Sequence, residues 1–265
     1  MGWWSNLASR LRLWPAPVLH IASDVGEGPV IVLVHGIASS AATFTRLLPE
    51  LSEKYRCISI DLLGFGASPA PEGASYTIEE HVAAIHRTIR SLGLRAPFVL
   101  VGHSLGALLS ARYASQHPEH VSRLVMVSPP VYLAPSEVSD PRVRAQLGAY
   151  LRAYEFMRQN KEFTISSMAR IAKLFALGDV LEVSERNWQP FRLSLQNCIE
   201  SQTTVSDIAA VRVPIDVVYG ALDGFIAAGT MRIIEQMRHV TTHRVEVNDH
   251  LVRKRLARAV VQVIG

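Results

Sequence analysis

The sequence predicts an α/β fold, a mostly parallel, doubly wound sheet with a block of helices inserted into it. Short apolar runs rich in β-branched residues alternate with segments of helical periodicity, which is typical of a parallel sheet covered on both faces. This alternation stops between Pro129 and Pro214 and then resumes. A Gly-x-Ser-x-Gly motif also lies directly between a predicted strand and a predicted helix.

The strands are predicted from short apolar runs that Gly, Pro, Asp or His residues bound. An edge strand is expected at residues 19–24, and a weaker last strand at 243–247. The clear runs are Val30–Val34, Cys57–Ile60, Phe98–Val101, Leu124–Val127 and Ile215–Tyr219. Helical periodicity covers about 41–53, 78–92, 105–117, 225–239 and 251–264.

The 265 residues divide into parts by this pattern. Residues 18–130 and 212–265 form the predicted α/β core. Residues 131–211 form a helical cap, inserted after the sixth strand of the core, and residues 1–17 form an amphipathic N-terminal segment. The helices expected within the cap are 143–157, 161–177 and 180–198.

Composition excludes several classes of protein. Hydrophobic residues make up 49% of the chain, charged residues 19%, and the formal net charge is only +4. No long basic run with interleaved aromatic residues occurs, so nucleic-acid binding is not expected. No stretch is long enough to span a bilayer. Cys57 and Cys198 lie far apart and are expected to be free thiols, which, without a secretory signal, favours a reducing, cytoplasmic setting.

The N-terminal segment carries apolar residues at helical spacing: Trp3, Leu7, Leu11 and Trp14. Pro15 follows and ends the pattern. Two interpretations stay open. The segment is a short helix packed on the core or on another copy, or it has a functional role. That role would be part of the substrate entrance, or an interfacial anchor that gives residues 3–14 a peripheral contact with a membrane surface.

Ser104 is the candidate nucleophile, at the centre of Gly102-His103-Ser104-Leu105-Gly106. A tight strand-to-helix turn raises a serine hydroxyl clear of the sheet edge, and glycines two residues before and after it avoid collision with the strand and helix. The same turn places the N–H of Leu105 at a helix N-terminus, where an oxyanion would form.

A second oxyanion donor is expected in the loop after Val30–Val34. The residue after His35-Gly36 is in position to donate its N–H, so Ile37 is the candidate. Gly36 allows the backbone to approach a substrate closely. His35 is better explained as a histidine that shapes the loop through hydrogen bonds to the backbone than as a base.

A serine hydroxyl needs an adjacent base, and that base needs an orienting carboxylate. His250 and Asp223 each follow a predicted strand end, at the edge where Ser104 emerges. Asp249 is a rival carboxylate, but adjacent side chains rarely aim at each other. Asp61 is expected to belong to a structural turn with two nearby glycines.

Together these motifs resemble the α/β-hydrolase superfamily, and most of all its small capped members: carboxylesterases, lactonases, carbon–carbon bond hydrolases and cofactor-free haloperoxidases. The residues that carry the resemblance are His35-Gly36, Asp61–Ser68, Gly102–Gly106, Gly220 with Asp223, and His250. The resemblance covers about 18–130 and 212–264 and implies a triad of Ser104, His250 and Asp223, with Ile37 and Leu105 as oxyanion donors. The chain departs from many relatives in having Asn248-Asp249 before the histidine, where they have glycine.

The resemblance implies a serine hydrolase that cleaves a carboxylic ester, or a related acyl compound, of a small, largely apolar substrate. Gly36, His103 and Phe225 are expected to contact that substrate. No metal and no organic cofactor is indicated. One alternative is a carbon–carbon hydrolase of the meta-cleavage type, and another is a slow or non-catalytic ligand-binding protein. For the carbon–carbon hydrolase, cap arginines would hold a substrate carboxylate, with the candidates Arg142, Arg144, Arg158 and Arg192.

Overall fold

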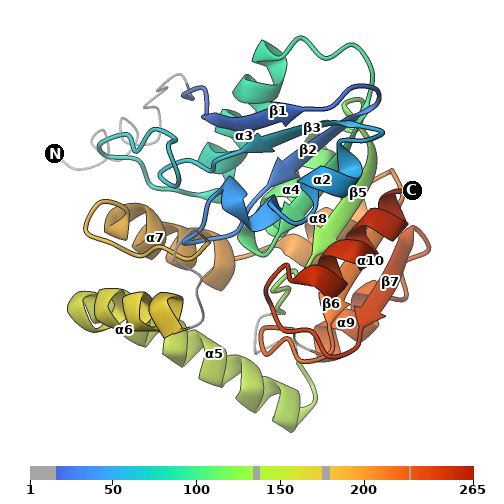
Figure 1. Ribbon diagram of the computed structural model, residues 1–265. Coiled ribbons are helices and arrows are strands. Elements are labelled where there is room, and N and C mark those ends of the chain that lie inside the picture. The colour runs from blue at the N-terminus through green and yellow to red at the C-terminus, as the bar shows by residue number, and fades with distance from the viewer. Residues whose placement is uncertain (1–15, 134–137, 175–179, 227) are drawn as a thin grey trace, which may run out of the picture.

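The computed structural model describes residues 16–133, 138–174, 180–226 and 228–265. Its strands form one sheet in the order β1-β3-β2-β4-β5-β6-β7 (Figure 1). The first strand pairs antiparallel with β3 at one edge, and every other pair is parallel. The α/β class, the mostly parallel sheet and the early edge strand are therefore confirmed. The strands are β1 (Ile21–Val25), β2 (Val30–Val34), β3 (Arg56–Ile60), β4 (Phe98–His103), β5 (Val121–Val127), β6 (Ile215–Gly220) and β7 (Val240–Val245).

Helices cover both faces of the sheet. On one face, α3 (Ile78–Ser91), α4 (Leu105–Gln116) and α8 (Thr204–Ala210) pack together, while α2 (Leu48–Leu51) and α10 (Lys254–Ile264) pack on the other. Alternate residues of a strand point to opposite faces, and Val32 and Ile31 accordingly belong to separate buried clusters. The remaining core elements are η1 (Ala41–Phe44), a short 3₁₀ helix, and α9 (Ala228–Ile234).

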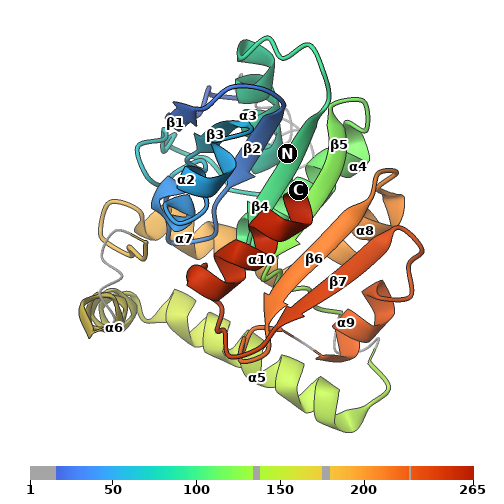
Figure 2. The ribbon, with the colours of Figure 1, turned by 45° about the vertical axis from the view of Figure 1, so that its right-hand side comes forward.

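The predicted insertion lies between β5 and β6, so it follows the fifth strand when the strands of this sheet are counted. Figure 2 shows α5 beyond the carboxyl ends of β6 and β7, with α6 at one end of α5 and α7 close to α6. We call this region, residues 131–211, the cap. Apart from α8, which lies within this range but packs against α4 on one face of the sheet, its helices are α5 (Pro141–Gln159), α6 (Lys161–Leu174), α7 (Trp188–Ser194) and η3 (Leu195–Glu200), a π-helical continuation of α7.

The last cap helix begins later than the periodicity from residue 180 predicts. The side chain of Asn187 accepts a hydrogen bond from the Ser184 N–H (2.8 Å) and donates to the Glu182 carbonyl (2.9 Å). Such side-chain bonds to nearby backbone compete with helix formation. Pro190 then falls in the first turn of α7, where proline is tolerated.

Other boundaries shift for local reasons. The segment 41–53 forms two short helices rather than one, and the last strand lies at 240–245 rather than 243–247. Cys57 and Cys198 are buried free thiols, as predicted. No helix within the described ranges is long and apolar enough to cross a membrane. The amphipathic pattern of Trp3 to Trp14 lies outside the described residues.

Candidate active site

Ser104 occupies a strained turn between β4 and α4. Its φ of 52° and ψ of −122° are sparsely populated by residues other than glycine and cost about 1–3 kcal/mol. A Cβ on Gly102 would lie 2.4 Å from the Gly106 carbonyl oxygen, and a Cβ on Gly106 would lie 2.2 Å from the Val34 carbonyl oxygen. The two glycines therefore let strand, turn and helix approach closely enough to hold Ser104 at the sheet edge.

Three polar side chains from distant parts of the sequence meet at this turn. His250 Nε2 lies 3.0 Å from Ser104 Oγ. His250 Nδ1 lies 2.9 Å from one carboxylate oxygen of Asp223 and 3.1 Å from the other. This geometry lets the imidazole accept the serine proton at one nitrogen while the carboxylate fixes its other nitrogen as a donor.

Asp223 is held in its charged form. Its side chain is fully buried, and burial alone raises the pKa of a carboxyl group. The hydrogen bond and charge of His250, together with a backbone N–H from Phe225 at 3.0 Å, outweigh that effect and hold the pKa of Asp223 below its usual value. The carboxylate therefore stays ionised at neutral pH.

The loop that carries His250 is shaped by Asn248. Asn248 is buried, and its amide donates to the carbonyls of Asp249 (2.7 Å) and Leu251 (3.1 Å). The rival carboxylate of Asp249 accepts from the Leu251 N–H and from Arg253. Asp249 thus stabilises the loop, and Asp223 is the carboxylate that bonds to His250.

His103 lies next to His250, with ring centroids 5.2 Å apart. Its Nε2 lies 3.0 Å from the carbonyl oxygen of His250, so it donates to the backbone of the histidine loop. Burial and the neighbouring His250 lower the pKa of His103 to about 3. His103 is a neutral ring that supports His250 rather than a second base.

The backbone amides of Ile37 and Leu105 are the candidate oxyanion donors. Leu105 is the first residue of α4, so its N–H has no acceptor within the helix. On the other side, the Leu62 N–H donates to His35 Nε2 (2.8 Å), so the ring proton sits on Nδ1 and is donated to the Gly36 carbonyl (2.7 Å). Because C=O and N–H of a trans peptide point in opposite directions, the Ile37 N–H points away from His35.

His35 therefore shapes the loop, as predicted. It is fully buried, and burial lowers its pKa to about 4, so the ring is neutral and its single proton stays committed to Gly36. Asp61 also has a structural role. Its carboxylate accepts from the N–H groups of Ala41 (2.8 Å) and Ala67 (3.0 Å), which ties together two loops at this edge.

A cavity of about 400 Å³ adjoins Ser104 and His250. The three residues predicted to contact substrate, Gly36, His103 and Phe225, all line it. Its cap side is apolar, and an ion pair between Asp249 and Arg253 (3.1 Å) lies at its edge. The apolar cap residues that line it include Met157, Met168, Leu181, Phe191, Leu195 and Ile199.

Two tyrosines that the sequence did not single out hold the loop after Asp223. Tyr132 donates to the Phe225 carbonyl (3.0 Å), and Tyr150 of α5 donates to the Gly224 carbonyl. Tyr154, which lines the cavity, bonds to the Tyr132 hydroxyl (3.0 Å). The cap is thereby tied to the acid loop, a link between segments too distant in sequence for local patterns to reveal.

Comparison with known proteins identifies the family of the fold. The alpha/beta hydrolase fold family matches residues 29–204. "Probable lysophospholipase BODYGUARD 2" of Arabidopsis thaliana is 38% identical over 113 residues, which cover 41% of this chain and 24% of that protein. The 2-(acetamidomethylene)succinate hydrolase of Mesorhizobium japonicum is 33% identical over 128 residues, 48% of this chain and 45% of that protein. The chain thus spans about a quarter to a half of the length of these curated relatives.

Solved structures share the fold at low sequence identity. The esterase of Exiguobacterium antarcticum superposes with a TM-score of 0.72 at 18% identity, covering 94% of this chain and 99% of that one. With strand order, nucleophile turn and family match in agreement, the chain belongs to the alpha/beta hydrolase fold family.

Proposed function

We propose that the protein is a serine hydrolase that cleaves the carboxylic ester of a small, largely apolar molecule. The observation that carries this proposal is a line of hydrogen bonds beside an apolar cavity. It runs from Ser104 Oγ to His250 (3.0 Å) and from His250 to Asp223 (2.9 Å). A hydroxyl is a weak nucleophile by itself, and this line supplies the base and the orienting acid that it needs.

In the first half of the reaction, Ser104 Oγ attacks the ester carbonyl while His250 Nε2 takes the hydroxyl proton. The amides of Ile37 and Leu105 donate to the resulting oxyanion, and Asp223 stabilises the charged imidazole. When the intermediate collapses, His250 gives the proton to the leaving alkoxide. The alcohol departs and the acyl group stays on Ser104.

In the second half, water replaces the alcohol. His250 takes a proton from water as its oxygen attacks the acyl carbon, and the same two amides hold the new oxyanion. The C–O bond to Ser104 breaks, and the proton returns from His250 to the serine oxygen. The products are a carboxylic acid and the free enzyme.

The cavity supports a substrate with an apolar acyl chain. Sulfur and hydrocarbon side chains from the cap line it, and among the described residues no cap arginine does. Arg253, an arginine of the core that lines the cavity, is paired with Asp249. Each methylene buried there contributes about 0.8 kcal/mol of binding. Lipid-like esters fit this lining, and a relative named as a probable lysophospholipase accords with them.

The same lining weighs against the carbon–carbon hydrolase, for which a cap arginine would hold the substrate carboxylate. Arg144 instead bonds to the Val138 carbonyl (2.7 Å), and Arg158 pairs with Glu200 (2.9 Å). Arg142 and Arg192 do not line the cavity either. The ester interpretation therefore has the better support.

The test compares the wild type with Ser104→Ala on p-nitrophenyl esters of two to twelve carbons, with a vinylogous diketone in parallel. We expect turnover of esters, loss of about 10⁴–10⁶-fold in kcat for the variant, and an unchanged Tm. Ester turnover that persists in the variant would contradict the nucleophile. Turnover of the diketone alone would favour the carbon–carbon hydrolase, and no turnover of either by the folded wild type would favour a binding protein.

A further inference from the structure

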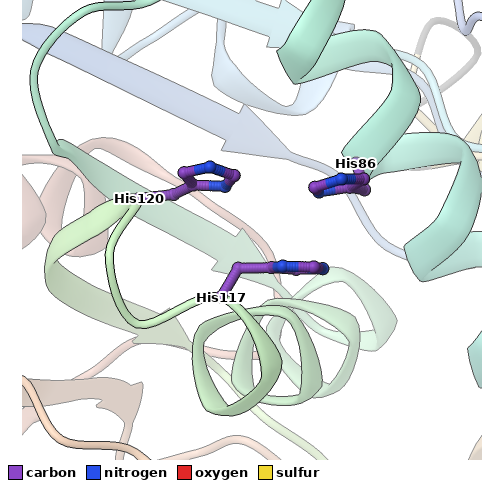
Figure 3. Close-up of side chains that lie close together, drawn as sticks. All are labelled: His86, His117 and His120. Atoms are coloured by element: carbon purple, nitrogen blue, oxygen red, sulfur yellow. The ribbon is translucent and has the colours of Figure 1, made fainter.

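Three histidines gather far from the proposed catalytic residues (Figure 3). His86 comes from α3, His117 caps the C-terminus of α4, and His120 lies in the turn before β5. One ring nitrogen of each lies within 4.8 Å of the others. The packing of α3 on α4 thus brings His86 to a pair of histidines, His117 and His120, that lie close together in the sequence.

Not every ring nitrogen of this cluster forms a hydrogen bond with the described residues. Nδ1 of His86 is buried and has no hydrogen-bond partner among the described residues. Nδ1 of His120 lies 2.8 Å from the Tyr113 hydroxyl, which leaves its Nε2 for another partner. An unpaired buried nitrogen costs free energy, and a bound cation would recover it.

A carboxylate stands beside the cluster. Glu119 Oε1 lies 3.5 Å from His120 Nε2 and 3.9 Å from His117 Nδ1, on a side chain that is 63% exposed and free to turn. Arg90 faces His86 and contributes the opposing positive charge. Three imidazoles with a neighbouring carboxylate form a donor set that suits Zn²⁺ and the related borderline transition ions.

We propose that His86, His117 and His120 bind one divalent transition ion of the Zn²⁺ class, with Glu119 as a fourth ligand. Tyr113 acts as the outer partner that orients His120, as hydrogen-bonded groups behind metal-binding histidines commonly do.

Binding one ion requires the histidine rings to move from the positions that they have in the structure. The rings of His86 and His117 are stacked, with centroids 4.0 Å apart and planes 15° apart (Figure 3). An imidazole donates its lone pair in the ring plane, so a shared ion requires at least one ring to rotate out of the stack. His117 and His120 have partly exposed side chains, and a cavity of about 270 Å³ borders His120 and Glu119. The cavity gives His120 and Glu119 space to adjust, and the partial exposure of His117 lets its ring rotate towards solvent.

The position of the site indicates what the ion would do. Ser104 and His117 lie at opposite ends of α4, and 13 residues of helix span about 20 Å. An ion at this distance takes no part in ester cleavage. It would join α3 to the turn between α4 and β5, and so stabilise the fold without changing the reaction.

The experiment uses the full chain without a polyhistidine tag, dialysed against a chelator and titrated with Zn²⁺ by calorimetry, with Ni²⁺ as a second probe. We expect one ion per chain and a rise in Tm of at least about 2–4 °C at saturating Zn²⁺. The double variant His117→Gln/His120→Gln should lose this binding, and Tyr113→Phe should weaken it by about 10-fold. His239→Gln, at a histidine bonded to the Ile208 carbonyl, is the matched control and should bind as the wild type does.

Ester hydrolysis reports folding independently, because none of these residues lines the 400 Å³ cavity beside Ser104. A variant that keeps full activity but binds no Zn²⁺ supports the site. The proposal is overturned by a wild type that binds no Zn²⁺ at 100 μM, or by an active double variant that still binds it, which would place the ion elsewhere, for instance at His103 and His250.

Discussion

The two sides of the cavity are built by different means. On the core side, strand ends deliver polar groups that each have a defined partner: Ser104 with His250, His250 with Asp223, and His35 with the Gly36 carbonyl. On the cap side, helices carry apolar side chains such as Met157 and Met168, which line the cavity without hydrogen bonds. Under the proposed function, the core side would determine the reaction and the cap side would determine which acyl chain reacts.

The largest expected effect on kcat comes from replacing the carboxylate of Asp223, on the core side of the cavity. We expect Asp223→Asn to lower kcat by about 10⁴-fold, because the amide no longer holds the imidazole in the required tautomer. Asp249→Asn is the matched control, since Asp249 lies next to His250 in sequence but bonds to Leu251 and Arg253. Steady-state assays of both variants check this. Equal losses in the two would mean that the acid has been assigned to the wrong residue.

The oxyanion loop should show the next largest effect. A Cβ on Gly36 would lie 2.9 Å from the Cβ of Ser104, so Gly36→Ala must displace the peptide that presents the Ile37 N–H. The loss of one oxyanion donor costs about 10²–10³-fold in kcat. Gly224→Ala is the control, because nothing lies within 4 Å of its added Cβ. If kcat for Gly36→Ala stays within a few-fold of the wild type, Ile37 is not a donor.

On the cap side, substitutions should change selectivity and not chemistry. Met168→Trp narrows the cavity, and excluding two methylenes should lower kcat/KM for dodecanoyl relative to butanoyl esters by about 10-fold. Phe163→Trp, on a residue that is 56% exposed and outside the cavity, should leave the ratio unchanged. A parallel fall for both ester lengths would show that the cap acts on the reaction itself.

The smallest effect concerns a polar contact between core and cap. His81 of α3 bonds through Nε2 to the Ser194 hydroxyl of α7 (3.0 Å), and burial lowers the pKa of His81 to about 3. Below about pH 6.5 the unfolded chain gains a proton here while the folded chain does not, so stability falls as pH falls towards 3. His35 and His103, with pKa values of about 4 and 3, act in the same direction.

Urea unfolding between pH 6 and pH 5 measures this contribution. As the pH falls, the unfolding free energy of the wild type should fall more steeply than that of His81→Gln. We expect the two slopes to differ by about 1.4 kcal/mol per pH unit, the value for one proton bound by the unfolded chain only. Between pH 7.5 and 8.5 the unfolding free energies of the wild type and His81→Gln should depend on pH in the same way, because the histidine is then uncharged in both states. An unchanged slope in the acidic range would mean that the folded protein accommodates a protonated His81.

The sequence predicts the core side well because its features are local or follow chain order. Gly102 and Gly106 are required by the sterics of one turn, and Asp223 and His250 follow strands whose carboxyl ends share an edge. The cap side depends on packing. The helix expected from residue 180 is displaced by the side-chain bonds of Asn187, which periodicity does not register.

Other contacts that sequence analysis missed join segments far apart in the chain. Tyr150 reaches the loop after Asp223, and the backbone N–H of Glu182 donates to the Ala38 carbonyl beside the oxyanion loop (2.8 Å). The histidine cluster likewise exists only because α3 packs on α4. Such pairs depend on the final arrangement of helices, and only the three-dimensional structure supplies it.

The covalent step at Ser104 is tested most directly by labelling the folded protein with a fluorophosphonate and mapping the adduct by peptide mass spectrometry. We expect one adduct per chain, located on Ser104, absent from Ser104→Ala and formed far more slowly by His250→Ala. An adduct on another residue, or none on a wild type whose unfolding transition is cooperative, would contradict the assignment of Ser104 as the nucleophile.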